Sequence, residues 1–487
     1  MMASALAHSA ARGAFFTLSA QAARIVLQLL SVVILSRLLS PHDYGLLAIA
    51  LVVVGLGEIF RDFGLTSASI QAPELSTGER DNLFWVNAAI GVVLTAITFV
   101  LAWPVAAISQ LGDLQGIVQW LSLIFLLNGV ATQHRANLMR DLKLRALAIV
   151  DVTSSAIALA AAVAAALLGA GFWALVVQQL TTGTAILVGV LIAGRWFPRW
   201  YSRAVPIRAF LTFGSHLVGA NLLAYVGRQI DTVTIAIRFG TQPLGLYNRG
   251  FQLIMTPLGQ VRSPLQSVAL PVLSRVQADQ RRFDTYVIAA QLALGYTIGI
   301  PLAIVAGLAD PIVGIMLGAR WAETAPLISM FAIAGLLTTV SFVGYWIYLA
   351  RGLGAELLRY TIVTTVIKIV CIVVGSFFGL FGVAVAFAVH PAIAWPISLA
   401  WLSRVTPIPH RKLYQGAGRI IATTLASGLA SLGIAHLTAS APDGVQLLLG
   451  LGGGVVIAAA FLVLPVYRRD ASSLLAFVRL MVKRQPQ

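Results

Sequence analysis

Long apolar stretches separated by short polar segments run along almost the whole 487-residue chain. A helix needs about 20 apolar residues to cross the hydrocarbon core of a bilayer, because its backbone polar groups must be paired within the segment. The pattern therefore predicts transmembrane helices. Fourteen stretches meet the length, near residues 14–36, 44–66, 83–107, 115–134, 147–169, 172–193, 210–236, 245–269, 285–306, 325–349, 357–378, 380–402, 414–437 and 444–466.

The pattern of stretches and turns also suggests an internal repeat. The first two helices meet at SRLLSPHDYGLL, and about 200 residues later the seventh and eighth meet at IRFGTQPLGLY. We predict an all-α integral membrane protein with two pseudo-symmetric six-helix lobes and two C-terminal helices, an arrangement that places a substrate path between the lobes. The predicted parts are residues 1–195, residues 196–405, the appended helices in 406–467 and a basic amphipathic cytoplasmic tail, 468–487.

The composition excludes a soluble protein. Hydrophobic residues make up 59% of the chain and charged residues 10%, against about 25% charged residues in an ordinary soluble domain. The net charge of +16 is high, but a nucleic-acid binder gathers its basic residues on a polar face. Here they occupy short segments between apolar stretches, so we expect membrane lipids as partners and no nucleic acid.

The basic residues also predict an orientation, because Lys and Arg favour cytoplasmic loops. With the N-terminus inside, 24 of the 33 basic residues fall in cytoplasmic segments. Outside the spans, only Arg37, Arg238 and Arg320 lie on the other side. We therefore expect both termini in the cytoplasm.

Several charged residues fall inside the predicted spans, where each costs about 2.5–3.5 kcal/mol even on permissive scales. In the first span, Thr17, Gln21, Arg24, Gln28 and Ser31 recur every three or four residues, which draws one polar stripe along a helix. Such a stripe is expected to face a cavity or a polar partner.

Four other spans carry polar residues of the same kind. The span 210–236 contains Asn221, Tyr225, Arg228 and Asp231, and Asp231 can pair with Arg228 three residues before it. The next span contains Arg249, Gln252 and Arg262, the span 357–378 contains Lys368, and the second span contains Glu58, Arg61 and Asp62 at a spacing that predicts ion pairing.

The balance of these buried charges predicts the kind of cargo. The predicted spans contain six basic residues and three acidic ones, Glu58, Asp62 and Asp231, if Asp151 is left out as interfacial. Arg24, Arg249 and Lys368 have no acid nearby in sequence. Unpaired cations in a low-dielectric cavity favour an anionic guest, and guanidinium groups suit phosphate oxygens. The alternative for any one of them is a structural pair or a side chain that reaches the interface.

Motifs for ATP hydrolysis and metal chemistry are absent from the sequence. There is no GxxxxGK[ST] phosphate loop and no HExxH motif, and the single cysteine, Cys371, excludes an internal disulfide and a cysteine metal cluster. We expect no cofactor and no metal. A membrane polymerase would need acid–base groups in an outer loop, and the longest one, 308–324, offers only Asp310, Arg320 and Glu323.

Two blocks of sequence are similar to a known family. They comprise SRLLSPHDYGLLAIA (36–50) with RDFGLTSASIQ (61–71) and FWVN (84–87), and LGLYNRGFQLIMTPLGQVRSPLQSVALPVLSRVQAD (244–279). They resemble bacterial Wzx-type polysaccharide flippases, the colanic and teichuronic acid exporters of the multidrug, oligosaccharidyl-lipid and polysaccharide exporter superfamily. The resemblance implies a protein of the bacterial inner membrane whose two lobes rock to carry an undecaprenyl-diphosphate-linked repeat unit, together with a possible polysaccharide polymerase and export complex.

These observations combine into one hypothesis for the site. The diphosphate is held by Arg24, Arg228, Arg249 and Lys368, the sugar is hydrogen-bonded by Gln28, Asn221, Tyr225 and Gln252, and structural or coupling ion pairs are formed by Glu58, Arg61, Asp62 and Asp231. Two alternatives stay open: a cation-coupled multidrug exporter, which would place unpaired carboxylates in its cavity, and a membrane polymerase or ligase.

Overall fold

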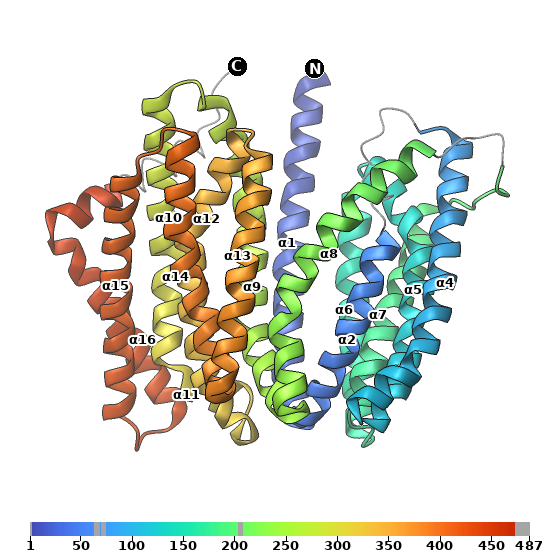
Figure 1. Ribbon diagram of the computed structural model, residues 1–487, viewed down its shortest axis with the longest axis horizontal. Coiled ribbons are helices and arrows are strands. Elements are labelled where there is room, and N and C mark those ends of the chain that lie inside the picture. The colour runs from blue at the N-terminus through green and yellow to red at the C-terminus, as the bar shows by residue number, and fades with distance from the viewer. Residues whose placement is uncertain (1, 63–68, 70–74, 203–207, 473–487) are drawn as a thin grey trace. The chain divides into compact units, whose positions relative to one another are not determined.

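The protein folds into long α-helices, as the hydropathy pattern predicts (Figure 1). The computed structural model describes the backbone of residues 2–62, 69, 75–202 and 208–472, and the side chains of these residues except 2–18, 62, 208–220, 223, 263–264 and 267–268. No strand occurs in these ranges, so the predicted all-α membrane fold is confirmed.

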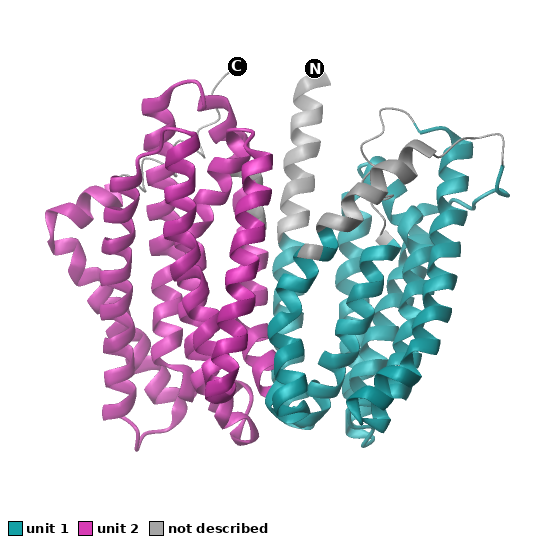
Figure 2. Ribbon diagram, in the orientation of Figure 1, with its two compact units in different colours: residues 1–245 teal, residues 246–487 magenta. Residues whose placement is uncertain are grey.

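The chain divides into two compact units, residues 1–245 and 246–487 (Figure 2). Unit 1 contains α1 (Met2–Leu38), α2 (Pro41–Asp62), α4 (Thr77–Ser109), α5 (Gly112–Arg140), α6 (Leu144–Leu167), α7 (Trp173–Gly194), α8 (Arg208–Phe239) and the start of α9 (Thr241–Val276). The predicted lobe boundaries at residues 195 and 405 stay a prediction.

Unit 2 begins within α9 and continues through helices of similar length. These are α10 (Gln280–Gly307), α12 (Ala325–Ala350), α13 (Gly354–Gly375), α14 (Gly379–Val405), α15 (His410–Leu437) and α16 (Asp443–Ala460), with the short α11 (Ala309–Met316) and a 3-10 turn (Ala319–Thr324) between α10 and α12. Most of the predicted tail, residues 473–487, lies outside the described residues.

Eleven described segments are long and apolar enough to cross a membrane, so the chain is a multi-pass membrane protein. One of them, Gly354–Val405, is 52 residues long. It is interrupted by a 3-10 turn and by Gly379 at φ +80°, a left-handed conformation that glycine adopts without strain. The predicted division of this stretch is therefore confirmed. The charged helices α8 and α9 are not among the eleven, and the count of fourteen spans stays a prediction.

The repeated turns noticed in the sequence meet in unit 1. A Cβ atom on Gly45 would overlap the carbonyl oxygen of Thr241, and one on Gly245 would overlap that of Pro41. Thr241 Oγ1 also lies 2.7 Å from His42 Nδ1. The first turns of α2 and α9 thus cross in backbone contact, in a reciprocal manner that matches their 200-residue offset.

This crossing predicts a sensitive glycine. Gly45→Ala forces two backbones apart, and such overpacking costs about 1–3 kcal/mol; we therefore expect a lower midpoint of thermal unfolding in detergent. Gly418→Ala is the control, because nothing lies within 4 Å of a Cβ atom there. An unfolding temperature for Gly45→Ala equal to that of the control would contradict the crossing.

Candidate functional site

Arg24, near the middle of α1, binds a carboxylate that also binds a second arginine. Arg24 Nη1 lies 3.2 Å from Asp151 Oδ2 in α6. Arg135 in α5 donates two hydrogen bonds to the same carboxylate, Nη1 to Oδ1 at 2.8 Å and Nη2 to Oδ2 at 2.9 Å. Arg24 also donates to Gln21, one turn before it. Two guanidinium groups therefore share one negative charge.

The expectation that Arg24 lacks a carboxylate partner is wrong. Asp151 was left out of the count as interfacial, but its side chain is only 15% exposed and pairs with Arg24. It faces α1 because α1 and α6 pack together, which no spacing within one helix reveals. The group of Arg24, Asp151 and Arg135 still has a net positive charge, because Asp151 also pairs with Arg135.

The polar stripe on α1 faces other helices of unit 1 along part of its length. Ser31 Oγ accepts a hydrogen bond of 2.9 Å from Gln178 Nε2 in α7, and Gln28 is half-buried between the turns that carry Arg24 and Ser31. The stripe is thus partly satisfied by the protein. The role of Gln28 in binding sugar stays a prediction.

The predicted ion pair in α2 is confirmed. Arg61 Nε lies 2.6 Å from Glu58 Oε2. Arg61 Nη1 also donates to Thr132 Oγ1 at 2.7 Å, and Asn128 Nδ2 donates to Glu58 Oε1 at 2.9 Å, both from α5. This network neutralises Arg61 and ties α2 to α5. The side chain of Asp62 lies outside the described residues.

In α8, the structure separates residues that the sequence grouped. Tyr225 is 9% exposed, and its hydroxyl donates to the carbonyl of Val52 in α2 at 2.7 Å. Asn221 is exposed. The Tyr225 hydroxyl proton is therefore donated within the protein. Towards a sugar, its oxygen could only accept a hydrogen bond.

Arg228 and Asp231 do not pair as predicted. Arg228 is exposed, whereas Asp231 is 3% exposed and accepts from the backbone N–H of Thr232 at 3.1 Å. Among the salt bridges of the described residues, none joins the two. Asp231 is turned into the bundle and Arg228 away from it, so a spacing of three residues on one helix was not sufficient to predict an ion pair.

Unit 2 holds a second cationic region, on α9 and α13. Arg249 is 4% exposed and donates from Nη1 to Gln252 Oε1 at 2.6 Å. Lys368 Nζ lies 5.2 Å from the ring centre of Phe387 in α14, within range of a cation–π contact. Phe387 in turn packs against Phe251 of α9. The structure thus links Lys368 to α9 through an aromatic side chain, and the roles of these residues stay predictions.

Arg262 illustrates a buried cation that serves packing. Its Nη2 donates to the carbonyl of Gly335 at 2.9 Å and to Thr339 Oγ1 at 2.5 Å, both on α12. The guanidinium also lies 5.5 Å from the ring centre of Phe342. These contacts fix α9 against α12, which agrees with the structural alternative.

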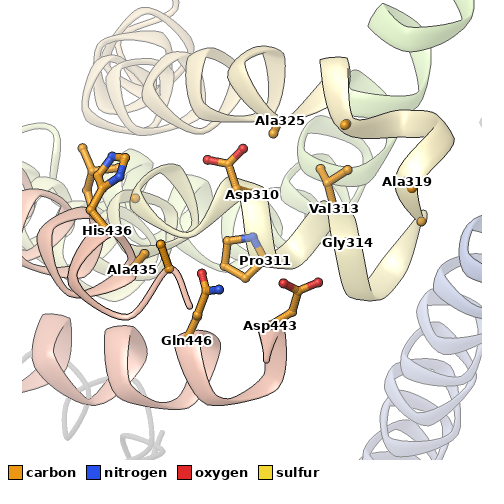
Figure 3. A pocket seen from close by; sticks show the side chains of 15 residues that line it. Asp310, Pro311, Val313, Gly314, Ala319, Ala325, Ala435, His436, Asp443 and Gln446 are labelled. Carbon is orange, nitrogen blue, oxygen red and sulfur yellow. The ribbon is translucent and has the colours of Figure 1, made fainter. Parts of the chain in front are cut away.

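Unit 2 also contains a cavity of about 420 Å³ that the sequence did not predict, where α11, α15 and α16 meet (Figure 3). Its polar lining includes Asp310, His436, Asp443 and Gln446. Asp443 begins α16 and His436 lies in the last turn of α15, so these residues meet only in the fold. No group of three metal-binding side chains occurs among the described residues. Two carboxylates repel phosphate, so this cavity does not suit a diphosphate.

Comparison with known proteins connects this architecture to polysaccharide assembly. Residues 34–326 match the family described as polysaccharide biosynthesis protein. The succinoglycan biosynthesis transport protein ExoT of Rhizobium meliloti is 26% identical over 439 residues, 88% of each chain. The lipopolysaccharide biosynthesis protein WzxC of Escherichia coli is 22% identical over 370 residues, 74% of each chain.

Solved structures show the same fold. The lipid II flippase MurJ in an inward closed conformation matches with a TM-score of 0.70 and 15% identity, over 92% of this chain and 98% of that one. An inward-facing multidrug resistance MATE transporter matches with a TM-score of 0.59 and 14% identity, over 84% and 98% of the two chains. At this identity the likeness shows the fold alone.

The geometry at Asp151 predicts that Arg135 contributes more to stability than Arg24. Arg135→Gln removes two hydrogen bonds to the carboxylate and Arg24→Gln removes one. A charge-assisted hydrogen bond contributes at most about 1.5–3 kcal/mol, and less where solvent screens it; the side chain of Arg135 is 30% exposed and that of Arg24 39%. We therefore expect Arg135→Gln to lower the free energy of unfolding by about 1–2 kcal/mol more than Arg24→Gln does. Denaturation in detergent measures this difference, and an equal or larger loss for Arg24→Gln would contradict it.

Proposed function

Because this chain belongs to the polysaccharide biosynthesis protein family, we propose that it is a flippase that moves an undecaprenyl-diphosphate-linked oligosaccharide from the cytoplasmic to the periplasmic leaflet by alternating access. The relatives that support this include a succinoglycan transport protein and a lipopolysaccharide biosynthesis protein. A lipid II flippase with the same fold is consistent with a lipid-linked cargo. The protein acts as a transporter and not as an enzyme.

One observation carries the proposal at the level of residues: Arg24 and Arg135 share the single carboxylate of Asp151. The cluster has a net positive charge inside a membrane-spanning bundle. A charge that packed helices shield from water is costly unless it is paired, and the phosphate group of a lipid headgroup supplies the missing anion. A guanidinium can bind two phosphate oxygens at once.

The unequal geometry of the cluster suggests how cargo binds and leaves. Arg135 holds Asp151 through two short hydrogen bonds, whereas Arg24 makes one contact at 3.2 Å. Arg24 is therefore the arginine that a diphosphate draws away from Asp151. When cargo departs, Asp151 recovers Arg24, and this competition keeps the diphosphate from binding too tightly to be released.

The second cationic region extends the proposal to unit 2. Arg249 and Lys368 contribute positive charge beside the aromatic side chains Phe251 and Phe387. Arg228, exposed on α8, adds a further guanidinium. Gln28, Asn221, Tyr225 and Gln252 offer hydrogen bonds to sugar hydroxyls, with Gln252 released from Arg249 as the headgroup arrives.

We place the protein in the bacterial inner membrane with both termini in the cytoplasm, as the basic loops predict. In that orientation the cargo is loaded where lipid-linked sugars are assembled and released to a polysaccharide polymerase and an export complex. The described start of the tail is held by Asp470, whose carboxylate accepts from Arg419 at 2.7 Å and from Tyr296 at 3.0 Å. The start of the tail is thus fixed to α15 and α10.

The first test removes a predicted headgroup ligand. Arg24→Ala or Lys368→Ala should abolish polysaccharide export while membrane levels of the protein stay unchanged, because the diphosphate loses a cation. Arg282→Ala is the control: its side chain is 75% exposed and pairs with Asp279 outside the apolar stretch. Wild-type export by both Arg24→Ala and Lys368→Ala would discard the assignment. Extension of a sugar chain or extrusion of a cationic dye by purified protein would favour a polymerase or a drug exporter.

The second test addresses Asp151. Asp151→Asn frees Arg24 from its competitor, so we expect tighter binding of undecaprenyl diphosphate, by about ten-fold for about 1.4 kcal/mol, together with slower translocation. Titration of the purified protein and a leaflet assay in liposomes measure the two quantities. Asp151→Glu, which keeps the charge, is the matched control. Weaker binding by Asp151→Asn would show that the carboxylate only supports the fold.

A further inference from the structure

The connection between α7 and α8 displays large aromatic side chains on its surface. In residues 195–202, Phe197 is 79% exposed, Trp200 86% and Tyr201 47%. The segment has no regular secondary structure between the end of α7 and Ser202. In a water-soluble protein, aromatic side chains of this size are normally largely buried, so what surrounds these exposed rings needs an explanation.

The backbone of the segment and the Trp200 ring are held in place by α4. Trp85 Nε1 in α4 donates to the carbonyl of Arg199 at 2.7 Å. Asn82 donates from Nδ2 to the carbonyl of Ser202, and its Oδ1 accepts from the N–H of Ser202, both at 2.8 Å. The rings of Trp85 and Trp200 stack with their centres 5.5 Å apart and their planes 2° from parallel. The exposure is therefore a fixed feature of the segment.

One aromatic residue of the segment faces the opposite way. Trp196 packs against His134 of α5, with ring centres 4.9 Å apart, and the Arg80 guanidinium lies 4.6 Å above its ring. The segment thus has an inner side, Trp196, which attaches it to α4 and α5. Its outer side carries Phe197, Trp200 and Tyr201.

The contacts with α4 locate the segment along the membrane normal. At 33 residues, α4 is about 50 Å long, against about 30 Å of hydrocarbon core. Its first residues, 77–82, are polar, and its apolar stretch starts at Leu83. Since Asn82 and Trp85 hold the segment, residues 195–202 lie at the boundary between water and hydrocarbon, where Trp and Tyr are favoured.

The segment is also basic. Arg195 and Arg199 are exposed, and no salt bridge found for the described residues includes either of them. Arg195 ends α7 in a left-handed conformation, φ 48°, which begins the turn into the segment. Cations beside interfacial aromatic rings complement the anionic headgroups of membrane lipids.

We propose that residues 195–202 form a lipid-binding anchor at the membrane surface, in which Phe197, Trp200 and Tyr201 enter the headgroup region while Arg195 and Arg199 bind the phosphates of anionic phospholipids. This site uses none of the residues assigned to the cargo and does not depend on the flippase proposal. It fixes residues 195–202 to the bilayer, so it supplies a lipid-dependent attachment on unit 1.

A fluorescent label tests the depth of the anchor. Cys371 is the only cysteine, so Cys371→Ser gives a cysteine-free chain into which Phe197→Cys is introduced and labelled with an environment-sensitive dye. In phosphatidylglycerol vesicles we expect quenching by lipids with a nitroxide near the headgroup, weak quenching by lipids labelled deep in the chain, and protection from aqueous iodide. Iodide quenching at position 197 as strong in vesicles as in detergent would overturn the proposal.

A matched position separates anionic lipid from a general membrane effect. Leu168, 87% exposed in the turn between α6 and α7, has no basic residue within LGAGF (168–172). Protection at Phe197→Cys should rise when phosphatidylglycerol replaces phosphatidylcholine, and protection at Leu168→Cys should not. Protection at position 197 that appears only in whole-cell membranes would assign the surface to a protein partner and would overturn the lipid proposal.

The arginines are tested by lipid retention in native mass spectrometry. The double variant Arg195→Gln/Arg199→Gln should bind phosphatidylglycerol more weakly, by about five-fold for each arginine, since one basic residue near an anionic surface contributes about 1 kcal/mol. Arg282→Gln, exposed and paired with Asp279, is the control. Unchanged retention by the double variant with a normal unfolding temperature would contradict the role of the arginines.

Discussion

A charged side chain within a lipid bilayer has no water to bind, so it must find a partner in the protein or in a ligand. The described cations meet this constraint in different ways. Arg61 binds the carboxylate of Glu58 and the hydroxyl of Thr132. Arg262 binds a backbone carbonyl and contacts an aromatic ring, and Arg249 binds a side-chain amide. These contacts tie α2 to α5 and α9 to α12, so the same charges that are costly in lipid also fix the packing of each unit.

The cluster of Arg24, Arg135 and Asp151 differs because its charges do not balance. A fully neutral network would be a stable structural element with little affinity for a further anion. A cation with no counter-ion would strongly oppose its own insertion. One carboxylate between two guanidinium groups lies between these limits: it makes the cluster tolerable in the empty protein and leaves it able to accept a phosphate. This intermediate state suits a carrier, which must bind and release its cargo.

Much of the fold could be predicted from the sequence because hydropathy and turn residues are local signals. The break at Gly379 and the similar turns near Pro41 and Thr241 are visible in single segments. The Glu58–Arg61 pair was predictable for the same reason. Two blocks of sequence were sufficient to identify the family.

The site was harder to predict because its contacts join distant helices. Asp151 lies 127 residues from Arg24, and its burial depends on the packing of α1 against α6. Arg135 lies just beyond the predicted span 115–134, whereas α5 continues to Arg140 and Arg135 reaches the same carboxylate. Arg228 and Asp231 had suitable spacing, but spacing does not say which side of α8 is covered. A single sequence carries no information on these pairings.

The central claim is that buried cations select a cargo by the charge of its headgroup. The most direct measurement is the translocation rate in liposomes for polyprenyl lipids that carry the same oligosaccharide on a diphosphate, a monophosphate or a neutral linker. The account predicts that the rate falls in this order, and that the advantage of the diphosphate is lost in Arg24→Ala. Equal rates for the diphosphate and the neutral lipid in the wild-type protein would contradict it.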